Sequence, residues 1–445
     1  MRSHTLSFPL VKILTGGLGS QLMKAGGLVL TANLLSGVIN FATVIITIRY
    51  LSPEAFGTLT FALTTMQLVG MLSNAGLNET LMTMISRAEA SQRPTEVTQA
   101  LSAIFRLRLV VSIAVATGGL LLARPIAEVF FRQAELTFPL ALGMVGACGI
   151  SLLQFNQTAL QAFRAYGRHA VVVLVRYTVI LVPLILLATI NRLGLTSTLV
   201  VNIGAPFLVF TLSLSYVSVG ISRGAGNPLA LLPHIWHLSK WVVVINLCSM
   251  FFSRLEIYFL TAFASPTELG IYSAAVKLCG GMLILEVAVR TVLFPEISRR
   301  ASMPGDLASF TRRSVVALGL VTGIVYGLGL LASPFIPVLV GERYAASVPI
   351  FLIVLAARAA VIPLVPLSLL FYPTNSTRAG AVFAATQLVV LVVFGLILVP
   401  TYGAAGAAWT SVLVSLAGWL YLGLFARSYL TGLRLPVRVS AEQVS

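Results

Sequence analysis

Ser52-Pro53-Glu54-Ala55-Phe56-Gly57 and Ser265-Pro266-Thr267-Glu268-Leu269-Gly270 are two copies of one short pattern, SPxxxG, placed 213 residues apart. In each copy the proline starts a turn and the glycine lets the chain enter the next helix. Farther along, Ile85-Ser86-Arg87 is matched by Ile297-Ser298-Arg299 at a spacing of 212. The chain is therefore predicted to consist of two copies of one structural unit.

The composition excludes most classes of soluble protein. Of 445 residues, 58% are hydrophobic and 9% are charged, whereas an ordinary soluble domain has about 25% charged residues. The net charge of +16 would normally suggest a nucleic-acid partner. There is too little polar surface for that role, so no nucleic-acid partner is expected. The charge instead favours a multi-pass membrane protein with its cations on one side of the bilayer.

The apolar stretches are long enough to cross a membrane, which takes about 20 residues in a helix. Twelve such stretches are predicted, at residues 25–48, 55–77, 107–123, 137–161, 170–190, 195–220, 240–263, 269–292, 314–340, 346–371, 379–399 and 404–426. The longest interruption, from Asn78 to Arg106, leaves no room for a soluble catalytic domain, so an enzyme is not expected.

The two SPxxxG copies follow the first and the seventh stretch, so both halves have the same orientation in the membrane. This predicts an all-α polytopic membrane protein with about twelve helices in two six-helix lobes. The lobes are expected to be related by a parallel pseudo-two-fold repeat around a central cavity. The predicted parts are a cytoplasmic N-terminal segment 1–24, an N-lobe 25–220, a linker 221–239, a C-lobe 240–426 and a cytoplasmic tail 427–445.

The distribution of Lys and Arg predicts the orientation. With the N-terminus in the cytoplasm, 20 of the 29 cations, Arg106 and Arg108 among them, fall on the cytoplasmic side. Five fall on the opposite side: Arg49, Arg124, Arg132, Arg192 and Arg343. The N- and C-termini are therefore both expected in the cytoplasm.

Polar residues recur along one face of several predicted helices, at the spacing of about 100° per residue that places them together. Such residues either hydrogen-bond to neighbouring helices or line a water-filled path. Four such stripes favour the second role. The residues predicted to line the path are Asn33, Asn40, Gln67, Asn74, Gln154, Gln157 and Asn246.

Charged side chains inside the predicted spans are costly and indicate function. The cations are Arg254, Lys277, Arg290 and Arg358, and the carboxylates, possible ion-coupling groups, are Glu256 and Glu286. Glu286 and Arg290 are four residues apart, so they can simply pair with each other. Arg254 and Lys277 have no carboxylate at that spacing on a shared face and are the best candidates to bind an anion. Arg358 is the next candidate, unless it lies near a helix end and extends to water.

No metal site or cofactor is predicted. Cys148, Cys248 and Cys279 lie in apolar stretches without a CxxC pair, which favours simple packing. His234 and His237 form an HxxH without a third ligand nearby. A GxxxxGK[ST] phosphate-binding loop is absent from the sequence, so direct use of ATP is not expected.

The sequence resembles the polysaccharide biosynthesis flippases of the multidrug/oligosaccharidyl-lipid/polysaccharide exporter superfamily. The resemblance rests on five segments in order: LSPEAFG at 51–57, NAGL at 74–77, GIYSAAVKL at 270–278, FPEISR at 294–299 and PTYGAAGAA at 400–408. Glu256 departs from the family, where an Asp would be expected.

The resemblance implies a cationic cavity and the flipping of a polyprenyl-pyrophosphate-linked oligosaccharide across the bacterial inner membrane. Arg and Lys suit an anionic pyrophosphate, and amides and hydroxyls suit sugar hydroxyls. The implied partners are the lipid-linked glycan, membrane lipid and other assembly proteins such as a polysaccharide polymerase. The alternative is a cation-coupled multidrug or metabolite exporter that uses Glu256 or Glu286 as its ion site.

Overall fold

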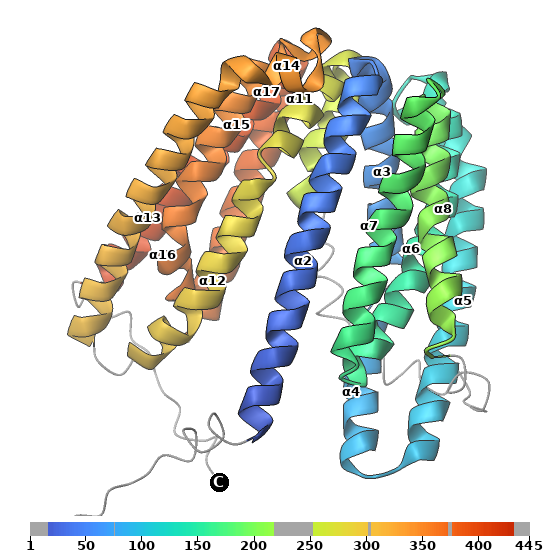
Figure 1. Cartoon of the computed structure of the whole chain (residues 1–445). Helices are drawn as coiled ribbons and strands as arrows, with labels where there is room; N and C mark the ends of the chain where they lie inside the picture. The colour runs from blue at the N-terminus through green and yellow to red at the C-terminus, as the bar shows by residue number, and fades with distance from the viewer. Residues whose placement is uncertain (1–16, 75, 218–251, 301–303, 373–375, 431–445) are drawn as a thin grey trace, which may run out of the picture. The chain divides into compact units, whose positions relative to one another are not determined.

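The computed structural model describes residues 17–74, 76–217, 252–300, 304–372 and 376–430, and every regular element in these ranges is a helix (Figure 1). The chain divides into two compact units: unit 1 is Met1–Leu51 with Thr58–Phe251, and unit 2 is Ser52–Gly57 with Phe252–Ser445. The predicted all-α fold in two parts is confirmed. The predicted linker 221–239 and the residues Asn246, Cys248, His234 and His237 lie outside the described ranges.

Within the described ranges, nine helices are long and apolar enough to cross a membrane, and the bent pair α11 and α12 makes a tenth. Two features explain why this count is lower than the predicted twelve. Helix α17 (Thr377–Leu430) covers both of the last two predicted spans. The predicted span 240–263 lies mostly outside the described residues. The chain is a multi-pass membrane protein.

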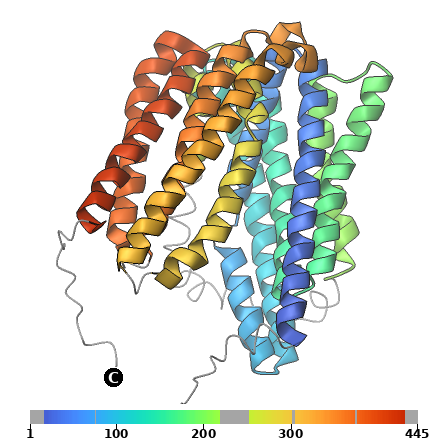
Figure 2. The same ribbon diagram turned by 60° about the vertical axis from the view of Figure 1, so that its left-hand side comes forward.

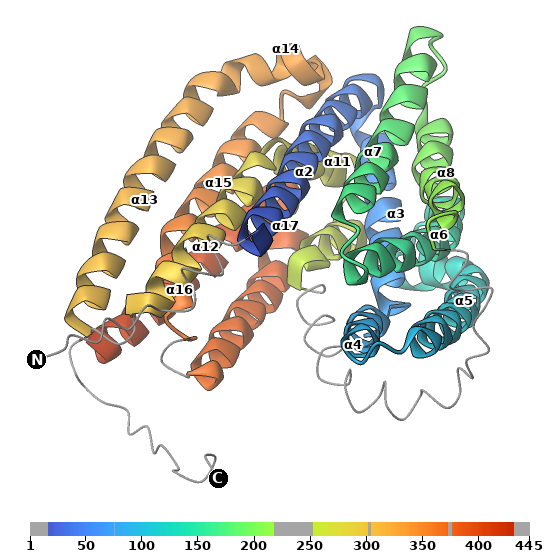
Figure 3. The same ribbon diagram turned by 60° about the horizontal axis from the view of Figure 1, so that its bottom comes forward.

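Unit 1 contains α2 (Gly17–Tyr50), most of α3 (Pro53–Leu72), α4 (Leu77–Ala90), α5 (Pro94–Pro125), α6 (Thr137–Ala162), α7 (Tyr166–Thr189) and α8 (Leu195–Leu214). Two short turns, Ile126–Phe130 and Ala134–Leu136, connect α5 to α6. Helix α2 packs along α7, and α6 packs against both α5 and α8. In Figure 3, α4 and α5 are joined by a short loop at one end of the unit.

The interruption predicted between the second and third spans is mostly helical. After α3 the chain breaks at Gly76, which has a φ of +77°, a conformation that glycine adopts readily. Helix α4 then begins, and α5 starts at Pro94, thirteen residues before the predicted span. Within this hairpin, two cations that were both predicted on the cytoplasmic side differ in their burial. Arg106 is exposed, whereas Arg108 is completely buried.

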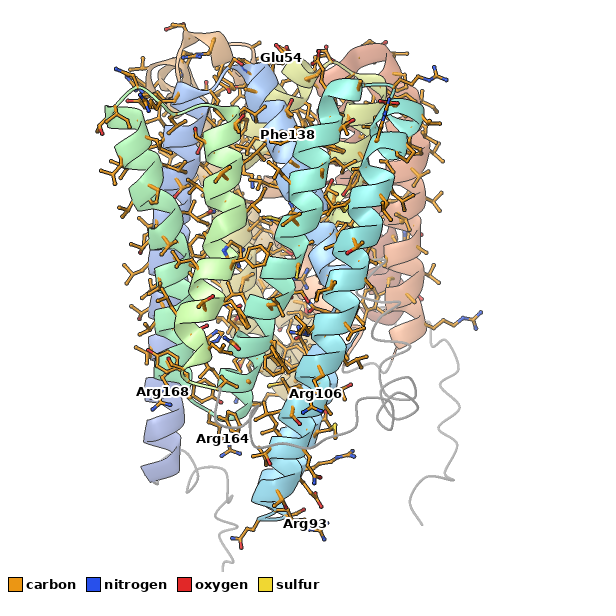
Figure 4. The ribbon with its side chains drawn as sticks, turned by 90° about the vertical axis from the view of Figure 1, so that its right-hand side faces the viewer. Glu54, Arg93, Arg106, Phe138, Arg164 and Arg168 are labelled. Atoms are coloured by element: carbon orange, nitrogen blue, oxygen red, sulfur yellow. The ribbon has the colours of Figure 1, made fainter. Side chains whose placement is uncertain are left out.

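Cations gather at one end of unit 1. Figure 4 shows Arg93, Arg106, Arg164 and Arg168 at this end, while Phe138 lies toward the other. Such an accumulation is what the positive-inside rule leads one to expect at the cytoplasmic side.

Unit 2 contains a helix over residues 252–263, α11 (Pro266–Leu278), α12 (Gly281–Arg300), α13 (Pro304–Ala332), α14 (Ile336–Val340), α15 (Ser347–Val361), α16 (Val365–Leu369) and α17. Three 3₁₀ turns, Ser333–Phe335, Glu342–Tyr344 and Ile362–Leu364, connect them. Helix α15 packs against α11, α13 and α17. Figure 2 shows α12 (yellow) and α13 (orange) running beside each other.

The two SPxxxG copies form the same local structure. Helices α3 and α11 begin at Pro53 and Pro266, and the preceding serine hydroxyl in each case accepts a hydrogen bond from a backbone N–H of the first turn, at 3.2 Å. Serine is a preferred residue at this capping position, and proline suits the first helical position. Both predicted turns therefore start helices, as the sequence pattern indicates.

The two turns also pack together within unit 2. A Cβ atom on Gly57 would overlap the carbonyl oxygen of Pro266, and one on Gly270 would overlap that of Pro53. Each glycine thus allows the backbone of the other copy to approach. Next to this contact, the rings of Phe56 and Tyr344 meet edge to face with centroids 6.3 Å apart. Burial raises the pKa of the Tyr344 phenol, which keeps it neutral.

Candidate functional site

Glu256 is the centre of a hydrogen-bonded group in unit 2. Its carboxylate accepts a hydrogen bond from the hydroxyl of Tyr272 on α11 and another, at 2.6 Å, from the hydroxyl of Ser411 on α17. Glu256 is partly buried and Tyr272 is fully buried. Three separate segments therefore hold one carboxylate in a fixed position inside the helical unit.

Three of the four predicted cations lie near this group. Lys277 and Arg254 are close enough for their charges to act on each other, and the charge of Arg358 acts on Tyr272 and Cys279. Arg254, Lys277 and Arg358 are all partly buried. The side-chain ammonium of Lys277 makes no hydrogen bond or ion pair to the residues that the structure describes. The group therefore combines three cations with one carboxylate whose oxygens are already engaged by hydroxyls.

The fourth cation is in a different situation. Arg290 forms an ion pair with Glu286 at 3.0 Å, one turn away on α12, and its side chain is 45% exposed. This is the simple pairing that the four-residue spacing allows. Glu286 and Arg290 are thus paired with each other.

The helix that carries Lys277 ends soon after it. The chain turns at Cys279 and Gly280, and the axes of α11 and α12 differ by 42°. The consecutive glycines Gly280 and Gly281 lie at this bend. Lys277 therefore stands in the last turn of a half-helix within a broken span.

In unit 1, two of the predicted path-lining residues contact each other. The amide nitrogen of Asn74 donates a hydrogen bond to the side-chain oxygen of Gln154 on α6. Gln67 and Gln157 are partly buried on α3 and α6. The structure therefore brings together Asn74 and Gln154, which are 80 residues apart in the chain.

The predicted stripe on α2 is divided. Asn33 and Asn40 are exposed, whereas Ser36, Thr43 and Thr47 are buried. The hydroxyls of Thr43 and Thr47 donate to backbone carbonyls of their own helix, at 2.8 and 2.7 Å. The hydroxyl groups of the two threonines are thus hydrogen-bonded within their own helix. Of the five residues, only the two asparagines remain accessible.

Unit 1 contains a second polar group, around Arg108, that was not predicted from the sequence. Arg108 on α5 donates to the side-chain oxygen of Asn78 on α4 at 2.6 Å and to the carbonyl oxygen of Ser151 on α6 at 3.2 Å. The hydroxyl of Thr158, also on α6, donates to the same oxygen of Asn78 at 3.1 Å. Asn78 and Thr158 each follow a predicted path-lining residue, Asn74 or Gln154, by four positions, which was the available signal. Arg108 gave none, because its burial depends on how α4 folds back along α5.

The chain matches the sequence profile of the polysaccharide biosynthesis protein family over residues 46–349. It is 26% identical over 340 residues to the succinoglycan biosynthesis transport protein ExoT of Rhizobium meliloti, covering 70% of this chain and 61% of that protein. It is 28% identical over 231 residues to the probable flippase AglR of Haloferax volcanii, covering 49% of this chain and 45% of that protein. The chain thus aligns with less than two thirds of the length of either relative.

Two solved structures share the fold. The lipid II flippase MurJ in an inward closed conformation matches with a TM-score of 0.72 and 14% identity, over 89% of this chain and 87% of that one. An inward-facing MATE family transporter of the MOP superfamily matches with a TM-score of 0.71 and 12% identity, over 89% and 95%. With the family match over two thirds of its residues, the chain belongs to the polysaccharide biosynthesis protein family and has the helical fold of these transporters.

Proposed function

We propose that this protein is a non-enzymatic carrier that flips polyprenyl-pyrophosphate-linked oligosaccharide repeat units across the bacterial inner membrane for surface or exopolysaccharide biosynthesis. In this proposal the membrane holds the polyprenyl tail while the charged headgroup passes through the protein. The N- and C-termini face the cytoplasm, and the glycan is handed on to a polysaccharide polymerase and other assembly proteins.

The observation that carries this proposal is the excess of cations around Glu256. Arg254, Lys277 and Arg358 all fall in predicted membrane-spanning stretches, where charged side chains are costly. The carboxylate next to them is occupied by Tyr272 and Ser411. A pyrophosphate offers several oxygen acceptors for Arg and Lys. We therefore assign Arg254, Lys277 and Arg358 to the pyrophosphate, with Arg290 as a further contact once its pair with Glu286 is released.

The amides predicted to line the path suit the sugar part of the headgroup. A side-chain amide offers both a donor and an acceptor, as sugar hydroxyls do. We assign Asn33, Asn40, Gln67, Asn74, Gln154, Gln157 and Asn246 to this role. The relatives named as a succinoglycan transport protein and a probable flippase support the same substrate class.

The decisive experiment is deletion of the gene followed by extraction of lipid-linked glycans. The expected result is accumulation of the repeat unit on its polyprenyl carrier, facing the cytoplasm, together with loss of the surface polysaccharide. Unchanged lipid-linked glycan and unchanged surface polysaccharide in the deletion strain would contradict the proposal.

A second candidate is a cation-coupled exporter, and the fixed position of Glu256 favours it. A carboxylate held by two hydroxyls can take up a proton or contribute oxygen ligands to a sodium ion. Glu256→Gln should then abolish the dependence of transport on a proton or sodium gradient. Drug hypersensitivity of the deletion strain with normal surface glycan would favour the exporter over the flippase.

A further inference from the structure

Asn78 is held by its side-chain oxygen alone. It is the second residue of α4, directly after the break at Gly76, and it is partly exposed. Its oxygen accepts the hydrogen bonds from Arg108 and Thr158, at 2.6 and 3.1 Å. Both acceptor positions of this carbonyl are therefore in use.

Arg108 determines which way the carboxamide points. A guanidinium group can only donate hydrogen bonds, so the oxygen of Asn78, and not its nitrogen, must face Arg108. Arg108 has no freedom to move away, because it is completely buried between the carbonyl oxygen of Ser151 and the ring of Phe155, 5.8 Å from the guanidinium carbon. The amide nitrogen of Asn78 is consequently directed away from this buried group.

That nitrogen is left as an available donor. It makes no hydrogen bond within the part of the chain that the structure describes. A polar donor facing lipid would be costly, so it must meet water or a polar ligand. Burial of an arginine is also costly, and the hydrogen bonds to Asn78 and Ser151 offset part of that cost.

A neighbouring amide repeats this arrangement. Gln154 lies one helical turn before Thr158 on α6, and its oxygen accepts a hydrogen bond from Asn74. In both Gln154 and Asn78 the oxygen is engaged inside unit 1 while the NH₂ group has no partner among the described residues. A ligand that fits this face must therefore offer acceptors rather than donors.

We propose that Asn78 donates a hydrogen bond to an oxygen atom of the sugar-phosphate headgroup, and that Arg108 and Thr158 are positioning residues that fix this donor. This assignment rests on the proposed flippase function and extends it to a specific contact in unit 1. The recognised atoms are the acceptor oxygens of phosphate, carboxylate or hydroxyl groups.

Asn78→Asp tests the donor without removing the buried contacts. An aspartate accepts the hydrogen bonds from Arg108 and Thr158 as asparagine does, but it has no NH₂ group. We expect the purified variant to unfold at the wild-type temperature or above. Surface polysaccharide in a complemented deletion strain should fall about tenfold, as expected for the loss of one hydrogen bond to a charged ligand. A polysaccharide level equal to wild type would overturn the proposal.

Glu79 provides the control for the added charge, because it is an exposed carboxylate next to Asn78 in the sequence. Glu79→Gln alone should leave transport unchanged. The double variant Asn78→Asp with Glu79→Gln keeps the wild-type net charge and should remain about tenfold impaired. If the double variant regains wild-type transport, charge and not the donor explains the first result, and the proposal is overturned.

The positioning role is tested at Thr158. Thr158→Val removes one of the two hydrogen bonds that orient Asn78 and should lower transport several-fold, while Thr158→Ser should restore it. Equal transport by both variants would contradict a positioning role. Asn78→Ala serves as a reference, because it removes both the NH₂ donor and the oxygen that accepts the buried hydrogen bonds.

The outcomes separate this proposal from the proposed function. If the deletion strain accumulates no lipid-linked glycan, the flippase function itself fails. If it accumulates the glycan and Asn78→Asp restores export as well as wild type does, only the assignment of Asn78 fails.

Discussion

Gly57 and Gly270 lie against one another: a Cβ atom built on Gly57 would come within 2.9 Å of the backbone nitrogen of Gly270. Both positions are the final glycine of an SPxxxG copy, so the sequence repeat corresponds to a physical contact between the two copies. The neighbouring atoms are backbone atoms, which cannot rotate aside as a flexible side chain could.

Alanine at either glycine should therefore destabilise the protein. Gly57→Ala and Gly270→Ala each place a methyl group on the backbone of the other turn, and overpacking of this kind costs about 1–3 kcal/mol. The expected result is a lower midpoint of thermal unfolding in detergent. Gly323→Ala in α13 is the matched control, because no atom lies within 4 Å of its Cβ position. A midpoint at or above wild type for Gly270→Ala would contradict the observed packing.

The kink in α17 predicts a second sensitive glycine. Gly403 has φ +53° and ψ −126°, a conformation that residues with a Cβ rarely adopt. A Cβ there would also overlap the carboxylate of Glu268. Gly403→Ala should lower the unfolding midpoint, with a backbone cost alone of about 1–2 kcal/mol. Gly423→Ala in the same helix, where the Cβ meets no neighbour, should be neutral or stabilising.

The cations near Glu256 predict a loss of export without a loss of protein. Arg254→Ala and Lys277→Ala should each reduce surface polysaccharide by about ten- to hundredfold, the factor expected for a lost hydrogen bond to a charged group. Membrane levels of the protein, measured by immunoblot, should remain normal. Arg93→Ala is the control, because Arg93 pairs with Glu96 at 2.8 Å in an exposed position, and such pairs contribute little. Normal polysaccharide from both test variants would reject the cationic site.

A charge reversal separates the two roles open to Arg290. The double variant Glu286→Arg with Arg290→Glu keeps the ion pair on α12 but moves the positive charge by one turn. If the pair is only structural, polysaccharide export should match wild type, and stability should change by no more than about 0.5 kcal/mol. Loss of export by the double variant, while its unfolding midpoint stays normal, would instead place Arg290 in contact with the substrate.

The sequence predicted the features that depend on neighbouring residues. Apolar stretches of about 20 residues mark membrane helices, and the serine and proline of SPxxxG mark the starts of α3 and α11. The pair Glu286 and Arg290 followed from the spacing of a helical turn. These features need no knowledge of which helices become neighbours.

The features that the sequence did not predict depend on contacts between distant segments. Glu256 was recognised as a charged residue, but its partners Tyr272 and Ser411 are 16 and 155 residues away. The burial of Arg108 depends on its contacts with Asn78 on α4 and Ser151 on α6.

The tight turn at Gly403, between the two helical halves of α17, has a practical consequence for mapping the membrane topology of this protein. An epitope or protease site inserted at residues 400–404 would disturb a closely packed turn, in which a Cβ atom on Gly403 would overlap the carboxylate of Glu268 and one on Gly406 would overlap the carbonyl oxygen of Leu398. Reporter insertions near Gly194 are better suited, because this residue lies between α7 and α8 and has open space around its Cβ position. Reporters inserted in unit 1 are therefore the better choice for determining which ends of the helices face the cytoplasm.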